Sequence, residues 1–171
     1  MDRLFLDANV LFSAAYRPKA GLLRLWKLKT VTLCSSRYAL EEARINLDDE
    51  AQRARLTRLS RGIHLFDAPP RELPHGVSLP DKDVPILLAA IEAKATHLIT
   101  GDVRHFGPYL GKRIEGILVL LPGDYLKTVT LTVTIGSTKY TPKESPSRQH
   151  WDYLNSNSNS SDIPQFFYIF Y

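Results

Sequence analysis

Five short apolar runs, separated by helical patterns, constrain the fold of this 171-residue chain more than any other feature. The runs are RLFLD at 3–7, TVTLCSS at 30–36, IHLF at 63–66, HLIT at 97–100 and GILVLL at 116–121. Runs that are apolar on both faces are typical of strands buried in a parallel sheet. The alternation with helices therefore predicts an α/β domain, with a central parallel sheet and helices on each side.

The predicted helices have recognisable ends. The helix over 37–47 has Ser35 or Ser36 as its N-cap, and the helix over 83–95 begins at Asp83 with Pro85 in its first turn. Further helical patterns cover 9–16, 20–28, 48–61 and the start of a closing helix at 122–126. Gly62 ends the segment over 48–61.

The composition changes after Lys127. Threonine alternates with apolar residues, then NSNSNSS follows at 155–161 and FFYIFY closes the chain at 166–171. This stretch has low complexity and no helix signal. We therefore expect a domain over 1–127 and a C-terminal appendage over 128–171, which is disordered or foreign to the domain and dispensable for it.

Cysteine usage and hydropathy exclude several classes of protein. The single cysteine, Cys34, excludes an internal disulfide and a multi-cysteine metal site. No apolar run reaches the length of a membrane-spanning helix, so we expect no membrane partner. Asp2 and Asp7 interrupt the N-terminal segment in a way that signal peptides do not. The expected location is the cytoplasm.

Basic residues outnumber acidic ones, with a net charge of +4 and a pI of about 9.2. The run RARLTRLSR at 53–61 carries four arginines and no acidic residue. It is either the solvated face of a helix or a track for phosphate groups.

Acidic residues stand where a parallel sheet would gather them. Asp7 lies within LFLDANVLF at the end of the first run, and Asp102 follows HLIT. Ligands of open α/β sheets bind at the carboxyl ends of the strands. Asp83 begins a helix, and the helix over 37–47 offers Glu41 or Glu42.

Carboxylates gathered in this way repel one another, and a divalent cation relieves the repulsion. Oxygen ligands without cysteine suit Mg²⁺ or Mn²⁺ better than zinc. Each acid also has a simpler explanation when taken singly. Asp7 and Asp83 are typical helix caps, Asp102 is a typical turn residue, and either glutamate suits an exposed helix face.

The order of these acids carries a family resemblance. It rests on LDANVLFSAA, SSRYALEEARINL, DKDVPILLAAIEAKATHLITGD, VRHF and LPGDYL, which together cover nearly all of residues 1–126. In this order they resemble the PIN domain family of metal-dependent ribonucleases, and within it the VapC-like toxins and their close relatives. The resemblance implies a PIN-like three-layer fold.

The resemblance also implies roles for particular residues. Metal ligands and catalytic residues would be the four acids Asp7, Glu42, Asp83 and Asp102. The family register favours Glu42 over Glu41, a choice that periodicity leaves open. Asp81 lies nearby, but only Asp83 sits where the apolar helix begins. Asn9 and Thr100 would orient ligands, and Arg104 or His105 would contact a phosphate of the substrate.

The implied activity is metal-dependent hydrolysis of phosphodiester bonds in RNA. Mg²⁺ or Mn²⁺ would be the cofactor, and single-stranded or looped RNA the substrate. Likeness to the toxin branch implies an endoribonuclease of a toxin–antitoxin pair, with a cognate antitoxin and a second copy of the chain as partners.

Two alternative functions compete with this interpretation. One is a PIN-like module that binds RNA without cleaving it. The other is a haloacid-dehalogenase-type phosphohydrolase with Asp7 as nucleophile. That chemistry needs a carboxylate as acid/base two residues later, where this chain has Asn9.

Overall fold

The computed structural model describes residues 1–134, with side chains as far as Val129. Its strands are β1 (Asp2–Leu6), β2 (Val31–Ser36), β3 (His64–Phe66), β4 (His97–Ile99), β5 (Arg113–Ile114) and β6 (Ile117–Leu120). Its helices are α1 (Ala8–Tyr16), α2 (Arg37–Ile45), α3 (Glu50–Ser60), α4 (Val84–Glu92) and α5 (Pro122–Thr134). Two short 3-10 helices, η1 (Gly21–Lys27) and η2 (Gly107–Tyr109), complete the described fold.

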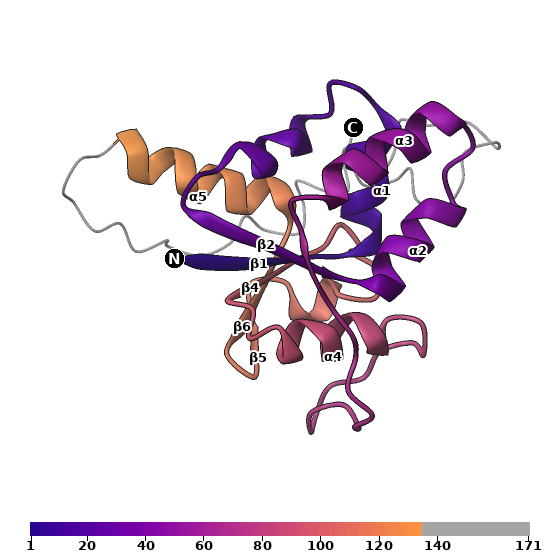
Figure 1. The fold of residues 1–171 in the computed structure, drawn as a ribbon. Coiled ribbons are helices and arrows are strands. Elements are labelled where there is room, and N and C mark those ends of the chain that lie inside the picture. Colours follow the sequence, from indigo (N-terminus) through magenta and orange to yellow (C-terminus); the bar gives the residue numbers. More distant parts are fainter. Residues whose placement is uncertain (135–171) are drawn as a thin grey trace, which may run out of the picture.

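The strands form one mixed, mainly parallel sheet in the order β3-β2-β1-β4-β6-β5. Helices flank it as the sequence predicted: α1, η1 and α3 lie above β1 and β2 in Figure 1, and α4 lies below them. β1 is central, parallel to β2 on one side and to β4 on the other. The carboxyl ends of β1 and β4 therefore meet at the same edge.

The central strands are parallel, as the sequence predicted, and one edge of the sheet is an antiparallel hairpin. β5 runs antiparallel to β6, and Glu115 and Gly116 connect the two strands. Both residues have positive φ, at 45° and 84°, which is the backbone of a tight two-residue hairpin turn. A φ of 84° strains any residue with a Cβ atom, so the turn favours glycine at position 116.

The core lies on both faces of β1. Leu4, Phe5 and Leu6 are fully buried, because β1 has neighbours on both edges and helices on both faces. Val10 of α1 and Ile86 of α4 are also fully buried. This packing fixes the end of β1, where Asp7 begins the next helix.

Side-chain caps set the starts of α2 and α3. Ser36 is the N-cap of α2, one of the two predicted candidates, and its hydroxyl accepts a hydrogen bond from the Ala39 N–H at 3.0 Å. Ser35 instead donates to the Leu6 carbonyl at 2.7 Å, which ties β2 to β1. Asp49 and Gln52 form a capping box at the start of α3.

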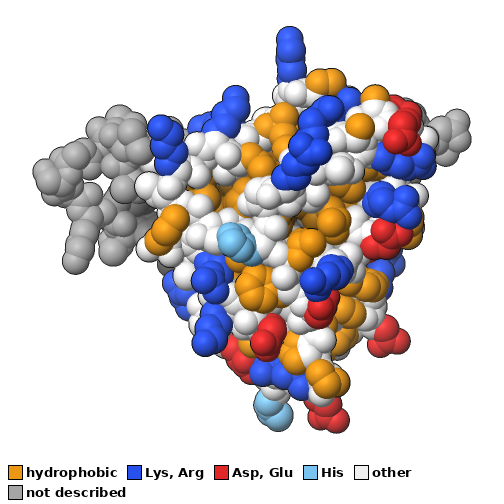
Figure 2. All heavy atoms as spheres, viewed as in Figure 1, with side chains coloured by type: hydrophobic (Ala, Val, Ile, Leu, Met, Phe, Trp, Pro, Cys, Tyr) orange, Lys and Arg blue, Asp and Glu red, His pale blue; other side chains and the backbone are white. Residues whose placement is uncertain are grey.

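Two of the four arginines in 53–61 bind the protein's own backbone. Arg55 donates to the Ala15 and Tyr16 carbonyls, at 2.7 and 3.0 Å, and Arg53 donates to the Leu47 carbonyl at 2.7 Å. Only Arg58 and Arg61 are exposed. Neither a solvated face nor a phosphate track thus describes the whole run. On the face seen in Figure 2, basic and acidic side chains intermingle.

The closing helix extends further than the sequence indicated. α5 continues past Lys127 to Thr134, although its last turns are rich in β-branched threonine and valine. The absence of a helix signal after Lys127 was therefore misleading. Tyr125 anchors the helix, because its buried hydroxyl donates to Asp2 Oδ2 at 2.8 Å. The NSNSNSS and FFYIFY segments lie outside the described residues.

No helix within residues 1–134 is long and apolar enough to cross a membrane.

Candidate metal centre

Asp7 lies directly after β1 and is buried, with 3% of its surface exposed. Its Oδ1 accepts from the Ala8 N–H at 2.6 Å, and its Oδ2 accepts from Thr100 Oγ1 at 2.6 Å and Asn9 Nδ2 at 2.8 Å. Asp7 does cap α1, as the helix-cap interpretation of the sequence predicted. Its hydrogen bonds, however, also reach across to the end of β4.

Asn9 and Thr100 join the ends of β1 and β4. Asn9 Oδ1 accepts from the Gly101 N–H at 2.8 Å, while its amide nitrogen donates to Asp7. Thr100 Oγ1 donates to Asp7 and accepts from the Asp102 N–H at 3.0 Å. Both side chains therefore hold Asp7 in one orientation.

The amide of Asn9 cannot provide the acid/base step of a haloacid-dehalogenase-type phosphohydrolase.

Burial raises the pKa of Asp7 to about 7. The hydrogen bonds from Thr100 and Ala8 act against this rise, and the charges of Asp83 and Glu42 add to it. A carboxyl group with this pKa is poorly stabilised as an anion by its own protein. A nearby cation would supply the missing stabilisation.

Asp102 follows β4 and caps a turn. Its Oδ1 accepts the N–H groups of Arg104 and His105, at 2.9 and 3.0 Å, and its Oδ2 lies 2.7 Å from His105 Nδ1. Asp102 is thus a turn residue, as the simpler interpretation of the sequence predicted. One of its carboxylate oxygens, however, faces the imidazole of His105. Arg104 itself is exposed.

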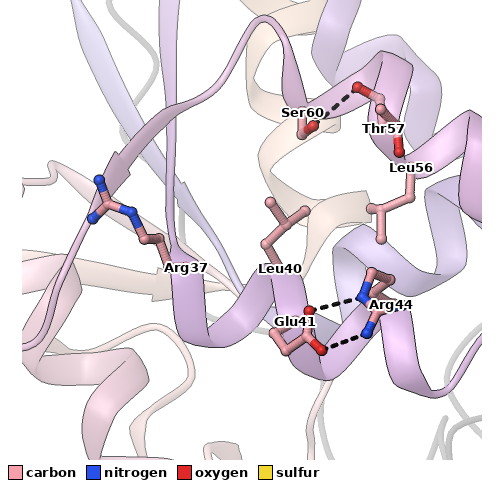
Figure 3. Close-up of a pocket in the computed structure, with 7 residues that line it drawn as sticks. All are labelled: Arg37, Leu40, Glu41, Arg44, Leu56, Thr57 and Ser60. Carbon is pink, nitrogen blue, oxygen red and sulfur yellow. Dashed lines mark hydrogen bonds and ion pairs between the residues drawn. The ribbon is translucent and has the colours of Figure 1, made fainter.

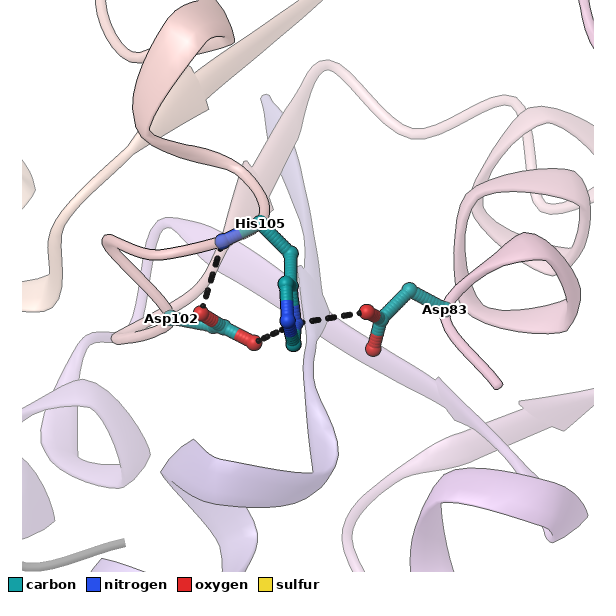
Figure 4. A group of neighbouring side chains, drawn as sticks. All are labelled: Asp83, Asp102 and His105. Carbon is teal, nitrogen blue, oxygen red and sulfur yellow. Dashed lines mark hydrogen bonds and ion pairs between the residues drawn. The ribbon is translucent and has the colours of Figure 1, made fainter. Parts of the chain in front are cut away.

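Asp83 stands at the N-cap position of α4, yet its side chain makes no capping hydrogen bond. It points instead toward His105, as Figure 4 shows, with Oδ2 2.9 Å from the imidazole Nδ1. The hydrogen bond of Nδ1 goes to Asp102, so Asp83 Oδ2 is buried without a hydrogen-bond partner. Capping therefore does not explain this acid.

Glu42 and Glu41 have different surroundings. Glu41 is exposed and forms two hydrogen bonds to Arg44, at 2.8 and 2.7 Å. Glu42 is half-buried, and its pKa is raised by burial and by the charges of Asp83 and Asp102. Only Glu42 therefore belongs to the electrostatic group formed by the other acids. Asp81, by contrast with Asp83, is exposed.

Sequence reasoning missed Lys82 and Tyr38. The charge of Lys82 lowers the pKa of both Asp83 and Glu42, acting against their burial. Tyr38 is 42% exposed, and the pKa of its hydroxyl is raised by partial burial and by the charges of Glu42 and Asp83. Tyr38 and Glu42 are four residues apart on one helix, and this spacing could have predicted that the two side chains are neighbours.

These residues fit a divalent cation. Asp83, Asp102 and His105 each offer a ligand atom, and the three atoms lie within 4.8 Å of one another. Asp7 and Glu42 add negative charge that burial disfavours. An ion would give the unpartnered Asp83 Oδ2 a ligand bond and would stabilise all of the carboxylates as anions.

A separate surface hollow lies between α2 and α3 (Figure 3). It is lined by Arg37, Leu40, Glu41, Arg44, Leu56, Thr57 and Ser60. None of the acids of the metal centre lines it, because α2 presents Glu41 to the hollow and Glu42 to the centre. We therefore assign it no part in the site.

The fold and the acidic centre together define an α/β protein suited to a divalent cation at the carboxyl edge of its sheet. The family model of the PIN domain matches residues 3–104, which include all of the acids just described. This chain belongs to the PIN domain family, as its sequence motifs predicted. PIN domains are generally nucleases that act on RNA or other nucleic acids, and they typically use divalent metals. The search of curated proteins found no match.

Proposed function

We propose that this protein is a divalent-metal-dependent endoribonuclease, with Mg²⁺ or Mn²⁺ as its cofactor. The observation that carries the proposal is the buried Asp83 Oδ2, which has no hydrogen-bond partner and belongs to a group of possible ligands with Asp102 and His105. A binding module would gain nothing from retaining such an atom, since leaving a buried polar group unsatisfied is costly, by about 1–3 kcal/mol.

Four acids are the proposed catalytic and metal-binding residues: Asp7, Glu42, Asp83 and Asp102. Asn9 and Thr100 orient Asp7 through their hydrogen bonds. When bound, the ion supplies positive charge that activates water for attack on a phosphodiester and stabilises the departing oxygen. The residues themselves exclude water from Asp7, fix its orientation and concentrate the negative charge that attracts the ion.

The proposed substrate is single-stranded or looped RNA. Lys82 is exposed beside Asp83 and offers a cation to a phosphate, while the exposed ring of Tyr38 offers a surface on which an unpaired base can stack. Arg104 is a second exposed cation, in the turn after Asp102. A base in a duplex is already stacked and cannot use the ring in this way.

The resemblance to VapC-like toxins supports a role as the toxin of a toxin–antitoxin pair, acting on RNA in the cytoplasm. A cognate antitoxin would then cover the acidic centre, typically with a basic side chain among the carboxylates, and a second copy of the chain would form a homodimer. A protein that processes RNA for housekeeping would use the same residues.

The function is tested by incubating the full chain with a panel of structured RNAs. We expect cleavage in Mn²⁺, no cleavage in EDTA, and loss of cleavage by at least about a hundredfold in Asp7→Asn. Ile45→Ala, a change on the exposed surface of α2, serves as the matched control and should cleave normally. RNA binding that EDTA does not affect, without cleavage by the folded protein, would instead support the non-catalytic binding module.

A further inference from the structure

His105 lies between two acids of the candidate metal centre. Its backbone N–H donates to Asp102 Oδ1 at 3.0 Å, which fixes the residue in the turn after β4. Its Nδ1 lies 2.7 Å from Asp102 Oδ2 and 2.9 Å from Asp83 Oδ2. Figure 4 shows the two carboxylates on opposite sides of the imidazole ring. The side chain is only 19% exposed, so these contacts with neighbouring residues fix its position.

One nitrogen cannot satisfy both acids with a single proton. The hydrogen bond goes to Asp102, and the buried Asp83 Oδ2 has no hydrogen-bond donor of its own, only the ion-pair contact with the same Nδ1 at 2.9 Å. A cation bound by Nδ1 and both oxygens would satisfy all three atoms at once. A buried carboxylate oxygen without a hydrogen-bond donor of its own is a second observation, beside the charge of the cluster, that points to a ligand.

The spacing of the three atoms suits such an ion. Metal–ligand bonds of about 2.1 Å hold neighbouring ligand atoms about 3.0 Å apart around an octahedral ion. The nitrogen-to-oxygen distances of 2.7 and 2.9 Å are close to this value, so small side-chain movements are sufficient. The position of His105 therefore matches that of a ligand and not only that of a hydrogen-bond donor.

We propose that His105 is a nitrogen ligand of the metal, beside Asp83 and Asp102, so that the centre prefers Mn²⁺ to Mg²⁺. The inference rests on the proposed function and specifies its cofactor. Mg²⁺ favours oxygen ligands alone, whereas an imidazole nitrogen raises affinity for transition-metal ions. The remaining donors are carboxylates, which Mn²⁺ accepts readily. The proton of the ring then resides on Nε2.

Pulsed electron paramagnetic resonance of the Mn²⁺-loaded full chain tests this directly, because a coordinated nitrogen gives a ¹⁴N coupling. We expect that coupling in the unmodified protein and in His75→Gln, whose histidine is exposed and serves as the matched control. We expect its loss in His105→Gln, with Mn²⁺ affinity falling about tenfold or more. Absence of the ¹⁴N coupling from the unmodified protein, or absence of Mn²⁺ binding, would overturn the proposal.

A second variant guards against misfolding of His105→Gln. His105→Asp replaces the nitrogen by an oxygen ligand, so it should still bind metal while the ratio of Mn²⁺ to Mg²⁺ affinity falls by about tenfold. An unchanged ratio in this variant would contradict the proposal. Thermal unfolding of each metal-free variant confirms that it is folded.

RNA cleavage measured on the same samples separates this inference from the proposed function. Nitrogen-coordinated Mn²⁺ in a protein that cleaves no RNA would keep His105 as a ligand and reject the nuclease. Cleavage that depends on Mn²⁺ without nitrogen coordination would keep the nuclease and reject His105 as a ligand.

Discussion

Tyr38 is the residue whose substitution tests most clearly how the substrate binds near the acids. Its ring is 42% exposed, and the charges of Glu42 and Asp83 act on its hydroxyl. Aromatic side chains are the surfaces on which unpaired bases stack, and a nucleobase is the ligand that a ribonuclease would bring to this ring.

We expect Tyr38→Ala to raise KM for single-stranded RNA while Tyr38→Phe keeps it near normal. Loss of one stacked base costs about 1–3 kcal/mol, which corresponds to about 5- to 150-fold in KM. Steady-state kinetics on a single-stranded oligonucleotide measure this effect, with Ile45→Ala as the control on the same helix. An equal loss in the phenylalanine variant would show that the hydroxyl matters rather than the ring.

At this scale the sequence predicted the positions of the acids but not their contacts. Glu41 and Glu42 flank the same apolar stripe, so periodicity could not choose between them. Their surroundings differ in the structure: Glu41 binds Arg44, whereas Glu42 is half-buried near Asp83 and Asp102. The approach of His105 to Asp83 depends on how α4 packs against the turn after β4. No local pattern encodes such a contact.

Among the elements, α1 and α3 are joined by an interaction that the charge pattern concealed. α1 has no basic residue in its last turn, and Arg55 of α3 supplies one by donating to the Ala15 and Tyr16 carbonyls. Positive charge at a helix C-terminus is stabilising, and the last carbonyls of a helix accept hydrogen bonds from outside it.

Arg55→Ala should therefore destabilise the protein by about 1–3 kcal/mol, because two carbonyl groups lose a charged donor. Arg58→Ala is the matched control, since Arg58 is exposed on the same helix, and it should change stability by less than about 0.5 kcal/mol. Urea unfolding followed by circular dichroism measures both. Equal effects of the two substitutions would contradict the assigned role of Arg55.

The buried strands and the long helices were predictable because their apolar patterns are strong. The β5–β6 hairpin was not, because β5 has only two residues and its turn signal is a single glycine. The length of α5 was also underestimated, since the β-branched residues after Lys127 favour strand on local grounds. Anchoring of Tyr125 on Asp2 joins residues 123 positions apart, which local sequence cannot reveal.

Across the whole molecule, His97 links β4 to the closing helix at the edge of the sheet opposite the acids. Its ring packs against Tyr125 with centroids 5.1 Å apart, and its Nδ1 lies 2.8 Å from Thr96 Oγ1. Burial lowers the pKa of His97 below its usual 6.5; the charge of Asp2 opposes this, and that of Arg113 adds to it. Folding therefore favours the neutral ring.

Because the folded-state pKa is depressed, His97 contributes stability above pH 6.5 and loses it as pH falls through the lower folded-state pKa. The unfolded chain binds more protons in that window, so the free energy of unfolding rises with pH there. Asp7 acts in the opposite sense, because its pKa is raised on folding from 3.8 to about 7. The two effects must be separated by a variant.

We expect the free energy of unfolding of the unmodified protein, minus that of His97→Gln, to rise with pH below 6.5, because only the unmodified protein carries the His97 contribution. Subtracting the two curves removes the contribution of Asp7. His64→Gln, which changes an exposed histidine, should give a curve parallel to that of the unmodified protein. Parallel curves for the unmodified protein and His97→Gln would show that the ring does not titrate differently on folding.

The most direct test of the account is to measure Mn²⁺ binding and RNA cleavage on the same full-length samples over one range of Mn²⁺ concentration. If the acids hold the catalytic ion, the concentration for half-maximal cleavage equals the dissociation constant, and Asp83→Asn raises both by about tenfold or more. Cleavage that persists in EDTA, or saturation with Mn²⁺ that produces no cleavage of any RNA, would contradict the account.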